Sequence, residues 1–363
     1  MAKRVVLDAR ALATTANSNR TYWQELILAF VRSQQSEPKV SLVLASNQPI
    51  ETAFLRNLAG WQTEISGPGN HRLWSLLHLP KLCRSVNADM AHVQYSISPL
   101  FRTPVVTTIH DVSYFIEPKW LPKKHAQILR WSVPSACKRA KAVVVVSQAV
   151  KDDLLRFVQI PAEKVVVAAN GAPTALALPK HEGLPEALLT KPFTLMVGGL
   201  TPRKNWRLAV EATAEARKLR PDLDLQLALP GPNSTTQEVP TWAHLLGPVN
   251  NKALAWLYRN CLCLVHPAIY EGFGLTPLEA WSYGSPALVS DIPPLRESAG
   301  PAGACVASQD PTTWAERILK LIDPITREEA VIKQAAQLGR FTWEQSAAKT
   351  REAYEYAANS SDS

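Results

Sequence analysis

The amino-acid sequence predicts an α/β protein built from two doubly wound domains. Short apolar runs alternate with amphipathic segments of helix length along the chain of 363 residues, a pattern typical of parallel sheets covered on both faces. The alternation breaks at residues 170–173 (Asn-Gly-Ala-Pro) and then restarts. The length is sufficient for two domains, each with its own core. We therefore expect two Rossmann-like domains that face a cleft, with ligands at the carboxyl ends of the strands.

The first domain is predicted at residues 1–172. Its strands are short apolar runs: Val5–Leu7, Val40–Leu44, Met90–Val93, Val105–Ile109, Val143–Val146 and Val165–Ala168. The segments between them have helical periodicity: Thr21–Arg32, Leu73–Val86, Ala126–Arg139 and Gln148–Phe157. Ser147 precedes the last of these and is a favoured type of N-cap residue.

The second domain is predicted at residues 173–340, and a final helical region at residues 341–363. Its strands are expected at Thr194–Val197, Leu225–Leu229, Leu262–Val265 and Ala287–Val289. Helices are expected at Trp206–Leu219, Lys252–Arg259, Leu278–Tyr283, Thr312–Ile322, Arg327–Leu338 and Trp343–Ala357.

Composition narrows the class of protein further. An apolar fraction of 46% and a charged fraction of 19% are globular values, and no run of apolar residues is long enough to span a membrane. The first residues lack a secretory apolar region, and the five scattered cysteines form no zinc or redox pattern. We expect a reducing, cytoplasmic location.

Charge is distributed unevenly between the two halves. Residues 1–172 contain 21 Lys and Arg against 11 Asp and Glu, whereas residues 173–363 contain 18 against 20. One interpretation is ordinary solvated charge. The other is attraction to an anionic acceptor or to an anionic membrane face, which would place the protein peripherally at the inner membrane.

The segment from His266 to Ala280 contains the richest motif. An apolar strand is followed by Glu271, a Gly-x-Gly loop and a helix start, which we expect at Thr276 as N-cap and Pro277 as first helical residue. Such a loop offers unpaired N–H groups and the positive end of a helix dipole to an anion. Glu279 has an alternative role, because Thr276-x-x-Glu279 also matches a capping box.

A second motif, residues 197–205, combines Gly198 and Gly199 at a strand end with Arg203 and Lys204 at a helix start. The glycines permit close backbone approach, and the two cations suit a diphosphate. The alternative is a solvated basic helix start, which is disfavoured because cations near a helix N-terminus are unfavourable unless an anion offsets them. In the first domain, His110 follows a strand end, where either a ligand contact or a structural histidine is compatible with the sequence.

Several other site types are excluded. Residues 1–59 contain no glycine, so no Gly-x-Gly-x-x-Gly loop follows the first strand, and neither a phosphate-binding P-loop nor a His-Glu-x-x-His motif occurs. Asp222-Leu223-Asp224 resembles a metal clamp, but its position before a strand indicates a turn. The eleven tryptophans are dispersed and fit core packing better than nucleic-acid stacking.

With these motifs in place, the chain resembles the retaining GT-B glycosyltransferases of the group 1, glycogen-synthase-like type. The specific pieces are the Glu-x7-Glu pair Glu271 and Glu279, Gly198-Gly199 with Arg203-Lys204, and His110-Asp111. Further matching segments cover nearly the whole chain: Val144–Ser147, Ala169–Gly171, Leu246–Val249 and Phe341–Glu344. The last resembles the start of the helix that crosses back onto the first domain.

The resemblance implies roles for individual residues. Arg203 and Lys204 would hold the donor diphosphate, Glu271 would accept hydrogen bonds from the sugar, Glu279 would bind the ribose and His110 would lie near the transferred sugar. Backbone N–H groups of Phe273, Gly274 and Leu275 would bind sugar and phosphate, and the loop at Val249 would meet the base. The family needs no bound metal, so no cofactor is expected.

One segment departs from the family pattern. A glycine-rich loop usually follows the first strand, whereas this chain has no glycine in residues 14–22. Asn17 or Asn19 can partly replace glycine, and Arg20 can reach a phosphate. Alternatively, this loop no longer touches donor or acceptor.

These observations predict a retaining glycosyltransferase that moves a hexose, of mannose or glucose type, from a nucleotide sugar to a saccharide or lipid-linked acceptor. No nucleic-acid partner is expected. The sequence around Glu271 looks most like mannosyltransferases of surface-polysaccharide pathways. The alternatives are a non-catalytic nucleotide-sugar-binding protein, suggested by the missing glycine loop, and a nucleotide-sugar epimerase.

Overall fold

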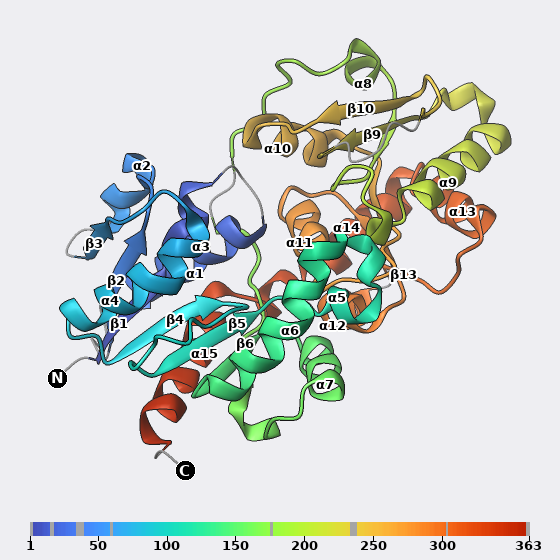
Figure 1. Ribbon diagram of the computed structural model, residues 1–363. Coiled ribbons are helices and arrows are strands. Elements are labelled where there is room, and N and C mark those ends of the chain that lie inside the picture. The colour runs from blue at the N-terminus through green and yellow to red at the C-terminus, as the bar shows by residue number, and fades with distance from the viewer. Residues whose placement is uncertain are drawn as a thin grey trace. The chain divides into compact units, whose positions relative to one another are not determined.

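The computed structural model describes residues 3–14, 18–33, 40–58, 61–174, 177–232, 238–302 and 304–360 (Figure 1). The chain forms two compact units. Unit 1 contains residues 1–171 and 342–363, and unit 2 contains residues 172–341. Each unit is built on one parallel sheet with helices, so the predicted α/β class is confirmed.

The sheet of unit 1 has the strand order β3-β2-β1-β4-β5-β6-β7, and all neighbouring strands are parallel. Its strands are β1 (Lys3–Asp8), β2 (Val40–Ser46), β3 (Gln62–Ile65), β4 (Met90–Gln94), β5 (Val105–Ile109), β6 (Ala142–Val145) and β7 (Val165–Val167). Six of these strands match the apolar runs of the sequence. The seventh, β3, was not predicted because it is a half-exposed edge strand with three polar residues.

Helices cover both faces of this sheet. They include α1 (Ser18–Ser33), α2 (Thr52–Leu55), α3 (His71–Leu73), α4 (Leu79–Ser85), α5 (Ser113–Ile116), α6 (Lys123–Arg139), α7 (Gln148–Phe157) and α15 (Trp343–Asn359). A π-helical turn, Trp74–His78, joins α3 to α4. Helix α15 packs on α1 and over β5, β6 and β7, which confirms that the last helix returns to the first sheet (Figure 1).

A buried chain of hydrogen bonds anchors α15. His92 on β4 lies between two hydroxyl groups, with Nδ1 2.7 Å from the Tyr354 oxygen and Nε2 2.7 Å from the Thr108 oxygen. The Tyr22 hydroxyl lies 3.2 Å from the same Thr108 oxygen. The network therefore links α1, β4, β5 and α15 inside the core.

The sheet of unit 2 has the order β10-β9-β8-β11-β12-β13, again with parallel neighbours. Its strands are β8 (Phe193–Leu195), β9 (Gln226–Pro230), β10 (Ala243–Gly247), β11 (Cys263–His266), β12 (Ala287–Ser290) and β13 (Cys305–Val306). The helices include α8 (Glu186–Thr190), α9 (Trp206–Leu219), α10 (Asn251–Asn260), α11 (Leu275–Ser282), α12 (Pro293–Ala299), α13 (Pro311–Lys320) and α14 (Pro324–Ala335). The two edge strands, β10 and β13, and the helices α8 and α12 were not predicted from the sequence.

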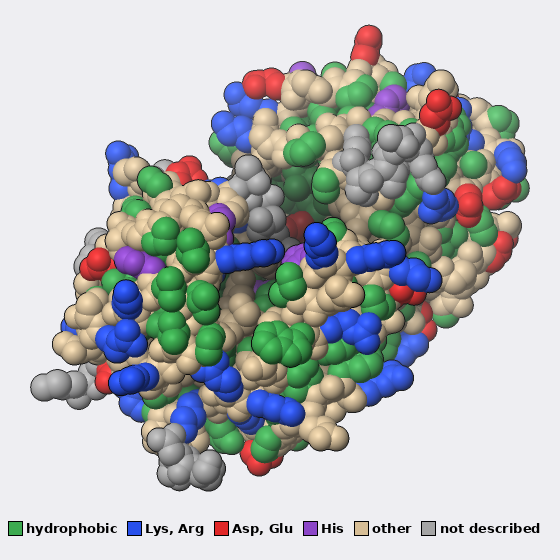
Figure 2. Space-filling model, viewed as in Figure 1, with side chains coloured by type: hydrophobic (Ala, Val, Ile, Leu, Met, Phe, Trp, Pro, Cys, Tyr) green, Lys and Arg blue, Asp and Glu red, His purple; other side chains and the backbone are tan. Residues whose placement is uncertain are grey.

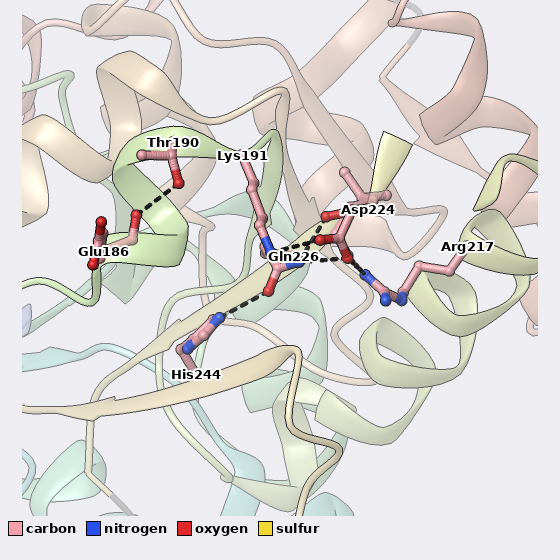
Figure 3. A network of polar contacts seen from close by, with 8 residues as sticks. Glu186, Thr190, Lys191, Arg217, Asp224, Gln226 and His244 are labelled. Carbon is pink, nitrogen blue, oxygen red and sulfur yellow. Dashed lines mark hydrogen bonds and ion pairs between the residues drawn. The ribbon is translucent and has the colours of Figure 1, made fainter. Parts of the chain in front are cut away.

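A network of polar side chains lies at the amino ends of strands β8, β9 and β10 of unit 2 (Figure 3). Asp224 accepts from Lys191 at 2.6 Å and from Arg217 at 3.0 Å, and Gln226 joins it to His244. Asp222 pairs instead with Arg220. The turn interpretation of residues 222–224 is therefore correct, and the described residues contain no group of three or more His, Cys, Asp or Glu that could hold a metal ion.

The cysteines are all free, and four of the five are buried. Burial raises the pKa of Cys83, Cys137 and Cys261 to about 12, which makes these thiols unreactive packing groups. Among the described residues, no helix is long and apolar enough to cross a membrane.

Candidate active site

The candidate site lies in unit 2, where the strand order reverses between β8 and β11. In doubly wound sheets, ligands bind beyond the carboxyl ends of the strands at this switch point. The loop after β8 leads to the 3₁₀ turn Pro202–Lys204, and the loop after β11 leads to α11. The N–H of Ile269 donates to the carbonyl of Arg203 at 2.8 Å, so the two loops are joined through their backbones.

Three side chains from these two loops and one from the end of β11 form one ion cluster. The Lys204 ammonium contacts Oε1 of Glu271, and Nη1 of Arg203 lies 3.5 Å from Oε2. His266, the last residue of β11, lies 3.1 Å from Oε1 through its Nε2. Glu271 and His266 are buried, whereas the Arg203 side chain keeps 27% of its surface exposed. The structure thus brings together three predicted site residues and adds His266.

The contacts within the cluster determine the protonation states of Glu271 and His266. Burial by itself would raise the pKa of Glu271, but Lys204, the hydrogen bond from His266 and Arg203 together hold it well below its usual range. Burial, reinforced by Lys204, lowers the pKa of His266. At neutral pH the site therefore contains one carboxylate, two cations and a neutral imidazole.

The glycine pair after β8, Gly198 and Gly199, lets this loop pack against the loop that follows β9. Gly199 has a φ of +63°, and a Cβ there would lie 2.1 Å from the Pro232 carbonyl oxygen. The N–H groups of Gly198 and Gly199 both donate to the carbonyl of Pro230 at 3.0 Å. These amides already have partners, so the glycines serve close packing. A Cβ on Gly198 would contact the Lys204 side chain at 3.4 Å, so this glycine leaves room for the lysine.

Helix α11 begins differently from the expectation. It starts at Leu275, with Gly274 as N-cap at a φ of +95°, so Thr276 and Pro277 lie inside the first turn. Only glycine adopts this backbone readily, and the helix therefore starts two residues earlier than the sequence signal suggested. Proline is tolerated there because first-turn N–H groups lack helical partners. The N-cap gives no side-chain hydrogen bond, so the helix end remains suited to an anion.

Glu279 is not part of a capping box. Its Oε2 accepts a hydrogen bond of 2.6 Å from the hydroxyl of Tyr258 on α10. Burial raises the pKa of Glu279, and the ring of Tyr258 stacks on Tyr283 at 5.8 Å. The capping-box alternative is therefore wrong, and the carboxyl group is held by a phenol.

Two other predicted contacts flank this region. Phe273 is buried and packs edge-to-face on Phe341 at 5.3 Å, so only its backbone is available to a ligand. Val249 is partly exposed in the loop after β10. That loop lies at the same sheet edge, because the N–H of Gly231 donates to the carbonyl of Gly247 at 2.8 Å and Gly231 packs on Gly199.

The remaining predicted residues belong to unit 1. His110 directly follows β5; its ring packs edge-on against Tyr22 at 4.6 Å and lies 5.8 Å from Tyr95, a residue with a φ of +61°. Burial lowers the pKa of His110 to about 4 against an opposing effect of Asp111, and its buried Nε2 has no hydrogen-bond partner in the described part of the chain. A neutral imidazole with an unused polar atom is consistent with either role left open by the sequence.

Asn19 and Arg20 lie in the first turn of α1, and Asn17 lies outside the described residues. The helix starts three residues earlier than predicted, so Asn19 takes no part in a loop. Arg20 donates to the Thr14 carbonyl at 2.9 Å and pairs with Glu51 at 2.6 Å. The guanidinium of Arg20 therefore links Thr14 and Glu51 to the start of α1.

His266 and Tyr258 were missed by sequence reasoning. The signal for His266 was present, because a histidine closes an otherwise apolar strand five residues before Glu271. Tyr258 had no local signal, since its contact with Glu279 joins two separate helices.

Models of known protein families match both halves of the chain. Residues 185–338 match the family model "Glycosyl transferases group 1", and residues 25–176 match "Glycosyltransferase Family 4". O-antigen chain mannosyltransferase B of Escherichia coli is 29% identical over 270 residues, covering 69% of each chain. O-antigen chain mannosyltransferase RfbU of Salmonella typhimurium is 27% identical over 262 residues, covering 69% of this chain and 70% of the relative.

Solved structures share the fold. Sucrose-phosphate synthase from Thermosynechococcus elongatus aligns with a TM-score of 0.71 at 18% identity, over 97% of this chain and 98% of that one. Anabaena Alr3699/HepE in complex with UDP and glucose aligns with a TM-score of 0.69 at 16% identity, over 98% and 100%. WaaG, a glycosyltransferase involved in lipopolysaccharide biosynthesis, aligns at 0.67 and 14% identity, over 96% and 98%.

Proposed function

Because this chain belongs to the group 1 glycosyltransferases, we propose that it transfers a hexose of mannose or glucose type from a nucleoside-diphosphate sugar to a saccharide or lipid-linked saccharide, with retention at the anomeric carbon. The chain is a glycosyltransferase by its family; donor, acceptor and stereochemistry are the proposal. Two relatives that share most of its length are named as O-antigen chain mannosyltransferases, which favours mannose.

One observation supports the proposal most strongly: the cluster of Arg203, Lys204 and Glu271 stands beside the uncapped start of α11 at the switch point. Breaking the bond between the anomeric carbon and the diphosphate leaves negative charge on the departing nucleoside diphosphate. Two cations and a helix N-terminus are the groups that stabilise such charge. We propose that they compensate it without a resident metal ion.

Glu271 and His266 would act on the sugar side. An ionised carboxylate is an acceptor only, so Glu271 suits the hydroxyl groups of the donor sugar. His266 donates to it and holds it in place from within the strand end. We expect Glu279, already held by Tyr258, to accept from the ribose, and the loop at Val249 to meet the base.

His110 would contribute from unit 1. Its neutral ring can donate or accept a hydrogen bond at a sugar hydroxyl, and its unused Nε2 offers one such atom. Asn19 and Arg20 would then act indirectly by shaping the start of α1.

The proposal is tested by turnover of sugar nucleotides. We expect slow release of nucleoside diphosphate from GDP- or UDP-hexoses, and faster release with an acceptor saccharide. Glu271→Gln and Lys204→Gln should each reduce the rate by at least about 100-fold, because each removes a charged side chain that is proposed to stabilise the transition state. Lys191→Gln, at the opposite edge of the same sheet, is the matched control and should retain activity.

Folding must be monitored, since removing one member of a buried ion pair costs about 3–5 kcal/mol. The double variant Lys204→Gln/Glu271→Gln removes both charges and should regain stability while staying inactive. Near-normal turnover in either single variant would refute the proposed site. Conversion of the nucleotide sugar to an epimer without acceptor would favour the epimerase alternative, and binding without turnover would favour a non-catalytic binder.

A further inference from the structure

Three segments of unit 1 form one continuous surface, which we call the α4–α6 face: residues 71–85 (α3, the π turn and α4), residues 95–103, and α6. Right-handed crossovers place the connections from β3 to β4 and from β5 to β6 on the same side of the sheet. Hydrogen bonds join the segments: the Ser98 hydroxyl donates to the Leu76 carbonyl at 2.6 Å, and Arg139 donates to the Ile97 carbonyl at 3.3 Å.

This face exposes large apolar side chains. Trp131 keeps 79% of its surface exposed, and five aliphatic residues keep between 41% and 48%. Ile128 and Trp131 lie on the exposed stripe of α6, three positions apart, and the other four come from the two remaining segments: Leu73, Leu76, Leu77 and Leu100. Figure 2 shows hydrophobic side chains gathered on this side of unit 1. An apolar surface of this kind marks a contact site.

The same face is strongly basic. Residues 71–85, 95–103 and 123–139 contain nine lysines and arginines and no aspartate or glutamate. Exposed basic residues lie at both ends of the α6 stripe, with Lys123 and Lys124 before Ile128 and Lys138 and Arg139 after Trp131. Lys and Arg side chains surround the hydrophobic ones in Figure 2. Much of the excess positive charge of the first half is therefore concentrated here.

We propose that the α4–α6 face binds an anionic lipid bilayer. Tryptophan and leucine side chains insert at the level of the headgroups, while surrounding cations attract anionic lipids. A second copy of this chain fits less well, because two such faces would bring like charges together. A polyanionic macromolecule would engage the cations but leave the six apolar side chains without a role. This proposal does not rest on the reaction proposed for the chain.

Co-sedimentation with vesicles tests the proposal. We expect the full-length protein to bind vesicles of phosphatidylglycerol and phosphatidylcholine, and to bind phosphatidylcholine alone far more weakly. Ile128→Ser/Trp131→Ser should weaken binding by at least about 10-fold through lost apolar insertion. Lys123→Gln/Lys124→Gln/Arg130→Gln should weaken it by about 100-fold.

Unit 2 offers matched controls. Ile325→Ser/Ile332→Ser replaces two residues that are 69% and 63% exposed on α14 beside Glu328 and Glu329. Arg259→Gln/Lys320→Gln/Lys333→Gln removes the same number of exposed positive charges. Both controls should bind like the parent. Equal vesicle binding by the α6 variants and their controls would overturn the proposal. A concentration-dependent dimer that only the variant with Trp131→Ser abolishes would also overturn it.

Discussion

Glu271 shows how individual residues acquire their chemistry from the fold. Taken from the sequence, it is one of two carboxylates in a Glu-x7-Glu pattern. In the structure it is buried, yet Lys204, His266 and Arg203 keep it ionised. Glu279, eight positions later, has the opposite environment, because burial raises its pKa and a phenol is its donor. Spacing alone could not separate these two roles.

At the residue scale, His92 makes stability depend on pH. Burial, with a contribution from nearby His110, lowers the pKa of His92 to about 3, whereas an unfolded histidine titrates at about 6.5. The folded pKa is the lower one, so protons bind preferentially to the unfolded chain as the pH falls below about 6.5. The free energy of unfolding should therefore decrease between about pH 6.5 and pH 3, by up to about 1.4 kcal/mol per pH unit from this residue.

Denaturant unfolding at stepwise pH values measures this dependence. His92→Gln should flatten the curve in that window, while His125→Gln, an exposed position on α6, should leave its slope unchanged. Identical slopes for the His92 variant and the parent would show that this imidazole does not couple folding to pH.

At the element scale, the central strands could be predicted because a strand covered on both faces must be apolar throughout. Three of the four edge strands could not, whereas the fourth, β7, is an apolar run and was predicted. Strand β3 is largely polar, β10 contains His244 in the polar network, and β13 has only two residues. The start of α11 was misplaced because the conformation of Gly274 depends on the tertiary setting, in which a Cβ would lie 2.5 Å from the Leu295 side chain.

Helix α15 gives the element-scale prediction. The Tyr354 hydroxyl is the partner of Nδ1 of buried His92, and the Tyr354 ring stacks on Phe30 at 6.0 Å. Tyr354→Phe keeps the ring but leaves the imidazole nitrogen without its partner, which should cost about 1–3 kcal/mol of unfolding free energy. Tyr356→Phe on the same helix is the control, because Tyr356 is partly exposed, and its cost should be small. Equal losses for both variants, measured by denaturant unfolding, would contradict the anchoring role.

At the scale of the whole molecule, the features proposed for donor binding and for membrane binding lie in different units. The ion cluster and the uncapped helix start both lie in unit 2, whereas the basic apolar face and His110 lie in unit 1. Fold class was predictable because alternation of strands and helices persists along the chain. The ion cluster was predictable only in part: the sequence identified Arg203, Lys204 and Glu271, but the contribution of His266 requires knowing that β11 ends beside β8.

The central claim is that Arg203 and Lys204 bind the diphosphate of the donor. Titration calorimetry with GDP, UDP and the matching monophosphates tests it most directly. We expect one diphosphate to bind in preference to its monophosphate, with affinity that falls as salt is added, and Lys204→Gln to weaken it by about 10–100-fold relative to Lys191→Gln. Equal affinity for mono- and diphosphate, or unchanged binding in the Lys204 variant, would contradict the claim.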